Sequence, residues 1–392
     1  MLKATHNFFY RGLIGVSAVI ALVFLHLGVN EYLSIQFIAV GSLSLYVFSK
    51  TRFIRRQQVF TLMVLFCSFL IPLISNQSEV IEFLVAARFL LAILVLILAQ
   101  NVFYRESIDQ DFYLTCISYA AVLIFLVALA QFINITVYDS GALFLGSEFY
   151  GIDYGTTDLT VNTSTSRAKA FFSEPSTLAG WGLMVFAIGL HKNKFIFKAL
   201  GLSSIILSSS VSGLVLGAVL LTINFLSKGV IKLRFWPIIQ FMLFIMCLLV
   251  MGYFLEDRLV IILNSEDASS VIRILVPVKV IWMLISSGDF TGLARSDIVD
   301  LTGSFFGLDD VVNTFIFNLY IWYGIFGFVI LGLVLSILPK HARLFFICLG
   351  MINGDVFYYD RVLWLIMFLV ATSEVRSDSS NDKMRETEIA QK

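Results

Sequence analysis

The chain has 392 residues, of which 59% are hydrophobic and only 14% charged, and its 27 basic and 27 acidic residues balance. Soluble domains carry about 25% charged residues, so this composition excludes an ordinary soluble domain and predicts a chain that lies in lipid. A net charge of zero gives no support for nucleic acid or another polyanion as the partner.

Twelve apolar runs are candidate membrane spans, each of which needs about 20 apolar residues. They fall near residues 11–28, 32–49, 58–74, 80–100, 112–133, 171–190, 195–209, 211–227, 235–255, 313–338, 342–352 and 356–372. We therefore expect an all-α integral membrane protein with about twelve transmembrane helices, whose polytopic membrane domain covers residues 1–373. Residues 374–392 mix charges of both signs with Ser and Asn, which predicts a disordered cytoplasmic tail.

The distribution of Lys and Arg predicts which connections face the cytoplasm. The connections rich in Lys and Arg are 50–56, 192–194, 228–234 and 340–343. The connections without either residue are 30–31, 75–79 and 208–213. Among the short connections of this second side, only the last one contains a basic residue, Arg361, so we expect both termini in the cytoplasm and two long outer loops, at about 134–170 and 256–312.

The second long loop contains a hydrophobic stretch, SSVIRILVPVKVIWMLISS, at residues 269–287. Arg273 and Lys279 interrupt it, and it is shorter than a bilayer requires. Counting it as a span would also move the basic connection at 340–343 to the outer side, so we expect an interfacial helix. For both cations, snorkelling to lipid phosphates is the alternative to binding a ligand.

A short charged motif, RAKAFFSEPS, stands at the outer entrance of the run near 171–190. Ser173, Glu174 and Pro175 suit a helix start, because Ser can cap, Pro fits the first turn and a carboxylate favours the positive end of the helix dipole. Arg167 and Lys169 have no such explanation, since positive charge is unfavourable near a helix N-terminus. A bound polyanion would account for the two cations.

Arg88 lies inside the apolar run at 80–100, six residues beyond Glu82. A central Arg costs about 2.5–3.5 kcal/mol on insertion scales, so it normally faces a partner or a wet cavity. A spacing of six places Arg88 and Glu82 on different faces of a helix, which argues against a pair within the helix. A substrate-binding role for Arg88 is the alternative to a structural pair.

Further polar residues on the predicted outer side are candidates for binding substrate. Ser210 belongs to the SSSVSG hinge, where a tight turn of small residues and the binding of sugar hydroxyls are both open. Asp309 and Asp310 end the second long loop, and Asp355 lies in the last outer connection beside aromatic residues. These carboxylates either bind substrate or simply keep the loops soluble.

Several catalytic motifs are absent from the sequence. It has no Gly-rich phosphate loop, no HExxH and no CxxC, and neither long outer loop contains a histidine. The four cysteines lie inside apolar runs without paired spacing, so we interpret them as packing residues: Cys67, Cys116, Cys247 and Cys348. Chemistry on the outer side must therefore use carboxylates, cations and hydroxyls, and we expect neither a metal nor a cofactor.

The order of these motifs resembles that of the Wzy-type polysaccharide polymerases, which make O-antigens, capsules and exopolysaccharides, colanic acid among them. RAKAFFSEPS at a span entrance is followed by the Ser-rich hinge, by a long outer loop with an early Arg, and by DDVVNTFIFNLYIWYGIFG. The similarity runs in order from about residue 167 to 331, while the first five spans match only in number and character.

The resemblance implies a glycosyltransferase at the periplasmic face of the bacterial inner membrane. It would transfer a glycan chain from undecaprenyl pyrophosphate to the next lipid-linked repeat unit, without a metal or cofactor. Arg167 and Arg273 correspond to the paired outer-loop arginines of the family, and Glu174 to the Glu of its Glu-Pro motif. Cations would bind the pyrophosphate leaving group, and a carboxylate would take the proton of the acceptor hydroxyl.

The candidate residues fall into two groups. The catalytic candidates are Glu174, Arg167 and Arg273. The substrate-binding candidates are Arg88, Lys169, Lys279, Ser210, Asn313, Asp309, Asp310 and Asp355. The expected partners are undecaprenyl-pyrophosphate-linked repeat units, membrane lipids and a chain-length regulator, with no nucleic acid.

Two rival functions are an O-antigen ligase, which differs in its acceptor, and a flippase or other transporter of the lipid-linked units. The related ligases place a His before an Asn at the start of the tenth span, where this chain has Val312 before Asn313. Transporters more often consist of two similar internal halves and carry charged residues at the midplane of the membrane. Here the halves are unlike, and the polar residues gather in the two outer loops.

Overall fold

A computed structural model of the chain describes residues 28–30, 33–34, 48, 54–76, 80–103, 110–138, 168–172, 175–227, 276–294, 297–298, 300–301, 314–352 and 359–372. These residues are helical except at one short antiparallel pair of strands, β1 (Gly28–Asn30) and β2 (Leu33–Ser34). The strands flank the predicted connection at 30–31. The expected helical fold class is therefore confirmed for the described part of the chain, apart from this hairpin.

The described helices follow the apolar runs of the sequence. They are α3 (Arg56–Ser75), α4 (Val80–Phe103), α5 (Gln110–Tyr138), α7 (Pro175–Lys192), α8 (Phe195–Leu207), α9 (Val211–Ser227), α13 (Val276–Ser287), α15 (Phe315–Tyr323), α16 (Ile325–Ile337), α17 (Lys340–Met351) and α18 (Tyr359–Thr372). Three of them, α3, α4 and α5, are long and apolar enough to cross a membrane. The predicted spans near 11–28 and 235–255, most of that near 32–49 and the tail at 374–392 lie outside the described residues, so twelve spans stay a prediction.

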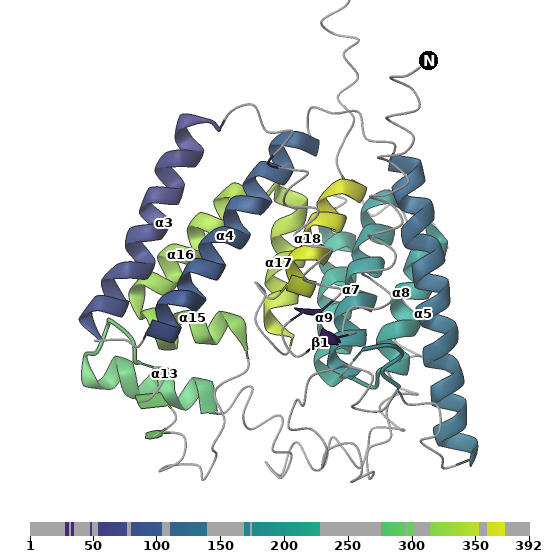
Figure 1. Cartoon of the computed structure of the whole chain (residues 1–392). Helices are drawn as coiled ribbons and strands as arrows, with labels where there is room; N and C mark the ends of the chain where they lie inside the picture. Colours follow the sequence, from purple (N-terminus) through teal and green to yellow (C-terminus); the bar gives the residue numbers. More distant parts are fainter. Residues whose placement is uncertain are drawn as a thin grey trace, which may run out of the picture.

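The helices stand side by side in two groups joined by a central pair (Figure 1). The first group holds α3, α4 and α16, the second holds α5, α7, α8 and α9, and α17 and α18 lie between them. Helix α18 contacts α4, α5 and α7, while α17 contacts α7, α9 and α15. The central pair therefore connects the two groups.

Helices α7 and α18 form the centre of the described bundle. In α7 every residue from 176 to 190 is buried, and in α18 every residue from 361 to 372 is buried. A helix that is apolar on all sides is stable only when other helices surround it. Glycine allows close contact between α7 and α8, since a Cβ on Gly182 would lie 2.8 Å from the carbonyl oxygen of Gly201 on α8.

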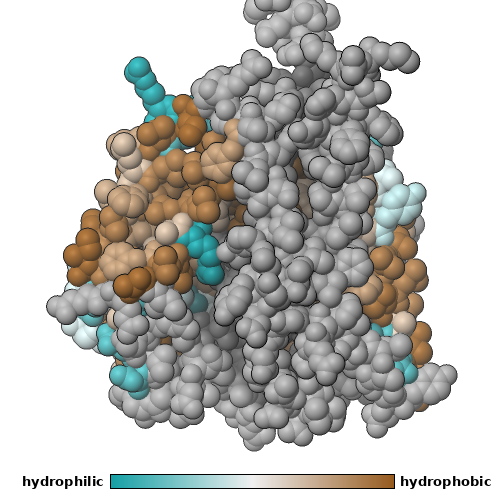
Figure 2. All heavy atoms as spheres, in the orientation of Figure 1, coloured by the Kyte–Doolittle hydropathy of each residue, from teal (hydrophilic) through white to brown (hydrophobic). Residues whose placement is uncertain are grey.

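The outside of the bundle is apolar, as lipid contact requires. Large hydrophobic side chains are exposed on α3, α5 and α16, among them Phe60, Met63, Val137 and Phe328. Figure 2 shows apolar side chains over the side formed by α3 and at the opposite edge near α5. Soluble proteins rarely expose apolar surface on this scale, so the chain is a membrane protein.

Helix α13 runs across the ends of the neighbouring helices, beneath α15 in Figure 1. Its buried residues Val276, Val280 and Leu284 pack against a small cluster that includes Tyr320 and Ile321 of α15. Its other face exposes Val278, Lys279 and Trp282. The helix covers 276–287 and not the predicted 269–287, whose first seven residues lie outside the described part, and its position at a membrane interface stays a prediction.

The predicted span near 313–338 is two helices, α15 and α16, which are joined at Gly324. Gly324 has φ 55° and ψ −135°, a conformation that side chains disfavour. The loop after α13 fills the break, because the Ile325 N–H donates to the Phe290 carbonyl at 2.9 Å and the Leu293 N–H donates to the Ile321 carbonyl at 2.8 Å. The expectation of one continuous helix is therefore wrong at this point.

The same loop is attached to the end of α3 through Asn76. The Asn76 side chain donates to the Gly292 carbonyl at 3.0 Å, and its oxygen accepts a hydrogen bond from the Thr291 hydroxyl at 3.3 Å. Both segments were expected on the outer side, and the structure brings them to the same end of the bundle. Which end faces the cytoplasm stays a prediction.

Contacts at the opposite end join segments that were expected inside. Gln58 and Asn101 exchange two side-chain hydrogen bonds, at 2.9 and 3.1 Å, which connect the start of α3 to the end of α4. The rings of His191 and His341 lie 4.6 Å apart and connect α7 to α17. These contacts agree with the predicted alternation of sides.

The break at Gly324 gives a direct test of this packing. We expect Gly324→Ala to lower the free energy of unfolding by about 1–3 kcal/mol through backbone strain alone, and by more because its Cβ would overlap the Phe290 carbonyl. Gly332→Ala in the middle of α16 is the matched control, because a Cβ there meets nothing within 4 Å. The control should be neutral or stabilising by up to about 1 kcal/mol. Unfolding experiments in detergent measure the free energy of unfolding of both variants. Equal values for Gly324→Ala and Gly332→Ala would contradict the described packing of the loop against Gly324.

Candidate functional site

Seven of the predicted site residues lie outside the described residues. They are Arg167, Glu174, Arg273, Asp309, Asp310, Asn313 and Asp355. The structure describes the other four, which are Arg88, Lys169, Ser210 and Lys279. The site is therefore built from Lys169 and its neighbours, and the other three are then located relative to their own helices.

Lys169 lies in a buried turn, at residues 168–172, that precedes α7. Gln131 of α5 holds this turn, because its side-chain oxygen accepts hydrogen bonds from the N–H groups of Lys169 (3.0 Å) and Ala170 (2.7 Å). Its side-chain nitrogen donates to the Ala170 carbonyl at 3.0 Å. Ala170 has a left-handed φ of 51°, which a residue with a Cβ adopts only when the surroundings hold it there.

The burial of Lys169 and Gln131 is nearly complete. The exposed fraction is 7% for Lys169 and 1% for Gln131. The turn is closed by a hydrogen bond of 2.9 Å from the Phe172 N–H to the Lys169 carbonyl. The Lys169 ammonium is therefore carried on a backbone that α5 fixes in place.

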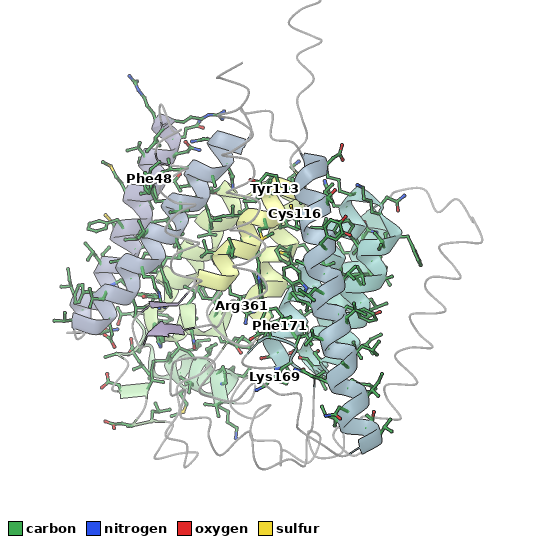
Figure 3. All side chains as sticks on the ribbon, turned by 45° about the vertical axis from the view of Figure 1, so that its right-hand side comes forward. Phe48, Tyr113, Cys116, Lys169, Phe171 and Arg361 are labelled. Carbon is green, nitrogen blue, oxygen red and sulfur yellow. The ribbon has the colours of Figure 1, made fainter. Side chains whose placement is uncertain are left out.

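An aromatic cluster connects this turn to α18. The ring of Phe172 meets Trp364 edge-on at a centroid distance of 6.2 Å, and Trp364 also contacts Trp181 of α7 at 6.5 Å. Arg361, one turn before Trp364, places its guanidinium carbon 4.9 Å from the centre of the Trp364 ring. Figure 3 shows Lys169, Phe171 and Arg361 in the same lower region of the bundle.

Arg361 is buried as well, with only 5% of it exposed, and Trp364 and Phe172 connect it to the turn that carries Lys169. Removing a cation from water is unfavourable by several kcal/mol unless anionic or acceptor groups surround it. The N-terminus of α7 begins at Pro175, as the sequence predicted, and it adds its positive dipole end close to Lys169 in the chain. A helix N-terminus of this kind is suited to an anion such as a phosphate.

Arg88 lies half-buried on α4, among aromatic side chains. Its guanidinium carbon is 5.5 Å from the centre of the Phe89 ring. Phe89 in turn contacts Phe69 of α3 and Phe315 of α15, each at 6.0 Å. The role of Arg88 in binding substrate stays a prediction.

Ser210 lies in the turn between α8 and α9, where the serine hydroxyls form hydrogen bonds with groups at the ends of the two helices. Its hydroxyl oxygen accepts a hydrogen bond from the Gly213 N–H at 3.4 Å and lies 3.2 Å from the Ser212 hydroxyl. The Ser208 hydroxyl donates to the Ile205 carbonyl at 2.6 Å and accepts from the Ser210 N–H. These contacts favour the tight turn of small residues, and sugar binding by Ser210 stays a prediction.

Lys279 lies on the exposed face of α13, near Trp282, of which 70% is exposed. An exposed cation on an interfacial helix is the arrangement that snorkelling to lipid phosphates requires. The buried face of α13 packs against α15 and against residues of the segment that follows α13, and binding of substrate by Lys279 stays a prediction.

Sequence reasoning missed two residues of this site. Gln131 is a single amide inside a long apolar run, and such a residue in a buried helix requires hydrogen-bonding partners. Arg361 was noted only as the exception to the positive-inside pattern, although its spacing of three from Trp364 allows contact on one helix face. Both signals are in the sequence, but neither identifies the partner.

No metal site is found in the described ranges, which contain no group of three or more His, Cys, Asp or Glu side chains placed to hold an ion. The histidine pair His191 and His341 lies at the other end of the bundle, where His341 contacts the Thr372 hydroxyl at 3.0 Å. The described part of the site offers cations and aromatic rings, and the expected independence of metal stays an expectation.

The comparison with known proteins identifies one family. The family model described as WcaD colanic acid polymerase matches residues 13–371, which is most of the chain. No curated protein matches the sequence.

The turn around Lys169 is tested by Gln131→Leu. This change leaves two N–H groups and one carbonyl of a buried turn without their partner, and each such group costs about 1–3 kcal/mol. We expect lower thermal stability and a Lys169 side chain that reacts with an amine reagent, as read by mass spectrometry. In the wild type, exposed Lys194 should react and buried Lys169 should not.

Gln58→Leu is the matched control, because Gln58 makes its hydrogen bonds at the opposite end of the bundle. It should leave Lys169 protected. Equal protection of Lys169 in the wild type and in Gln131→Leu would show that Gln131 does not fix this turn.

Proposed function

The chain belongs to the WcaD colanic acid polymerase family, and from this premise we propose that it joins lipid-linked oligosaccharide repeat units into a bacterial surface polysaccharide. The observation that carries the proposal is the family match over residues 13–371. In the proposed reaction the donor is a glycan chain on undecaprenyl pyrophosphate, and the acceptor is the next lipid-linked unit. We place the reaction at the periplasmic face of the inner membrane, with both termini in the cytoplasm.

The reaction breaks the bond between the anomeric carbon of the donor sugar and an oxygen of the pyrophosphate. A hydroxyl oxygen of the acceptor forms the new bond to that carbon, and its proton passes to a base. The lipid pyrophosphate leaves with the bonding electrons and carries more negative charge than before. A site for this step therefore needs cations that stabilise charge on the leaving group.

The buried Lys169 turn supports this assignment. Gln131 fixes its backbone next to the N-terminus of α7, where the helix dipole and the ammonium both attract an anion. Arg167 precedes the turn by one residue, and Arg273 precedes α13 by three residues. We propose that these arginines bind the pyrophosphate oxygens, because a planar guanidinium holds two of them at once.

Glu174 is the proposed base or the residue that orients Arg167. It immediately precedes Pro175, so it stands at the start of a central helix and five residues from Lys169 in the chain. Asp309, Asp310 and Asp355 are the competing carboxylates, and Asn313 is a candidate for binding sugar hydroxyls. A carboxylate in such a position removes the proton of the acceptor hydroxyl as the new bond forms.

The remaining features of the described structure fit the same scheme. Helix α13 exposes an apolar face with Trp282, which suits contact with lipid chains at a membrane surface. Lys279 on that face would meet the phosphates of membrane lipids. The family match supports a polymerase over the ligase and the flippase, which were the rival functions.

The function is tested with the purified chain and fluorescent lipid-linked repeat units. We expect a ladder of longer glycans that remain attached to lipid, formed without any other protein. A carrier would instead move labelled units across vesicles and leave their length unchanged. A ligase would add one chain to a different acceptor and give no ladder, so either result would contradict the polymerase.

Glu174→Gln tests the proposed base. The change keeps the shape and removes the charge, and loss of a general base typically lowers the rate about 10²- to 10⁴-fold. If Glu174 only favours the helix start, the change costs at most about 1 kcal/mol and polymer still forms. Polymer length on a gel from cells that lack the native enzyme measures the effect, with variant levels checked by immunoblot.

Glu79→Gln is the matched control for this variant. Glu79 immediately precedes α4, as Glu174 immediately precedes α7, so both changes remove the same charge from a helix start. We expect normal polymer from Glu79→Gln. If Glu174→Gln also gives normal polymer, Glu174 only favours the start of α7. The candidates for the base are then Asp309, Asp310 and Asp355.

A further inference from the structure

Basic side chains from two distant parts of the chain meet at one end of the described bundle. The turn between α7 and α8 carries Lys194, and the start of α17 carries Lys340 and Arg343. The rings of His191 and His341, which lie 4.6 Å apart, bring the two segments together. Lys194 lies three residues after His191, and Lys340 lies one residue before His341, so both lysines are carried close to this contact.

The turn between α7 and α8 holds Lys194 on a fixed backbone. The Lys194 N–H donates to the Gly189 carbonyl at 3.1 Å, and the Lys198 ammonium donates to the Asn193 side-chain oxygen at 2.7 Å. Asn193 has a left-handed φ of 54°, which asparagine adopts more readily than most residues. A Cβ on Gly189 would lie 2.5 Å from the Lys198 backbone nitrogen, so the two helices meet closely at this end. The exposed Lys194 side chain is therefore presented from a rigid turn.

Helix α17 begins with positive side chains at the end where the helix dipole is also positive. Its N-cap residue, Pro339, makes no side-chain hydrogen bond to the helix, and its first turn contains no acidic residue. Lys340 is exposed. The Arg343 Nε donates to the Leu338 carbonyl at 3.0 Å, which leaves the two terminal nitrogens of the guanidinium for other acceptors. Positive charge near a helix N-terminus is unfavourable, and an anion bound at this turn would offset it.

Apolar side chains stand directly beside these cations. Phe195 and Ile196, the first two residues of α8, are 65% and 51% exposed. They follow Lys194 in the chain, so an exposed cation is next to exposed apolar side chains. A phospholipid has the matching chemistry, since its phosphate attracts the cation and its acyl chains contact the apolar side chains. This juxtaposition favours a lipid over a soluble anion.

We infer that the place where the α7–α8 turn meets the start of α17 is a binding site for a phospholipid that carries two phosphates. One phosphate contacts Lys194 of the turn, and the other contacts Lys340 and Arg343 of α17. The acyl chains lie along Phe195 and Ile196. The site is at the C-terminal end of α7, whereas the candidate functional site is at its N-terminal end, so the inference does not depend on the proposed function.

The positive-inside bias by itself also places basic residues at this end. It predicts attraction to every anionic lipid according to charge, whereas two sets of cations held side by side predict a preference for one molecule with two phosphates. Once the first phosphate is bound, the second binds within the same molecule at a high effective concentration, so a bridging lipid binds more tightly. Comparing lipids with one and two phosphates therefore distinguishes a site from diffuse attraction.

Lipid binding is measured with the purified full chain in detergent, and native mass spectrometry counts the bound lipids. The probe is cardiolipin, which carries two phosphates, and it is compared with phosphatidylglycerol, which carries one, at equal phosphate concentration. We expect cardiolipin to bind about 10-fold more tightly or better, and to raise the unfolding temperature more than phosphatidylglycerol does. Equal affinity for the two lipids would overturn the inference.

Lys194→Gln and Lys340→Gln should each raise the Kd for cardiolipin about 5-fold, which is the contribution of one basic residue beside anionic lipid phosphates. Both side chains are exposed, so these changes remove charge with little effect on packing. Lys194→Arg and Lys340→Arg keep the charge and should keep the affinity. An unchanged Kd in the double variant Lys194→Gln/Lys340→Gln would overturn the inference.

Arg56→Gln is the matched control. Arg56 is an exposed cation at the start of α3, at the same end of the bundle but in the other group of helices (Figure 1). The change removes the same charge, and its Kd for cardiolipin should equal that of the wild type. An equal rise in Kd for Arg56→Gln would show diffuse attraction to the basic end, which overturns a site between α7 and α17.

A measurement on the wild-type chain needs no variant. Cardiolipin should protect Lys194 and Lys340 from an amine reagent, as read by mass spectrometry, whereas inorganic phosphate at the same phosphate concentration should leave both reactive. Equal protection by inorganic phosphate would assign the site to a soluble anion and overturn the lipid. Unchanged reactivity of both lysines at saturating cardiolipin would overturn the site itself.

Discussion

The complete burial of α7 and α18 is the constraint on which the rest of the described structure depends. In lipid, burial of apolar side chains gives no driving force, because the surrounding chains are as apolar as the helices themselves. What remains is close packing, and the glycines of α7 and α8 provide it by bringing the two backbones into contact. The other helices then group around this centre, and the site is attached to the N-terminal ends of α7 and α18.

A polar side chain buried among these apolar helices is retained only where it has a hydrogen-bonding or ionic partner. Gln131 shows the principle most clearly, since its single amide makes three hydrogen bonds to one turn. The buried cations Lys169 and Arg361 follow the same principle, since each has an interaction partner in the described structure.

The sequence predicted the helices, their order and the start of α7 at Pro175, because apolar runs and the Ser-Glu-Pro pattern report local preferences. It did not predict the break at Gly324, since the run FNLYIWYGIFGF is typical of one continuous apolar helix. The break depends on a loop about 30 residues earlier in the chain, whose Phe290 carbonyl and Gly292 occupy the gap. Arg361 and Gln131 were missed for the same reason, as each acquires its role from a different helix. Periodicity describes a helix alone, whereas these contacts belong to pairs of helices.

The break at Gly324 also changes how the chain meets the bilayer. Helix α16 has 13 residues and is therefore about 20 Å long, which is about 10 Å less than the hydrocarbon core of a typical membrane. Its exposed Ile325 and Phe328 are suited to contact with lipid on one side, and α15 runs in a different direction and does not lengthen the span. A hydrophobic segment that is too short draws the headgroups inward and thins the bilayer around it. Water and sugars would then reach deeper beside α15 than elsewhere around the protein, so a hydrophilic acceptor could approach the bundle without entering hydrocarbon.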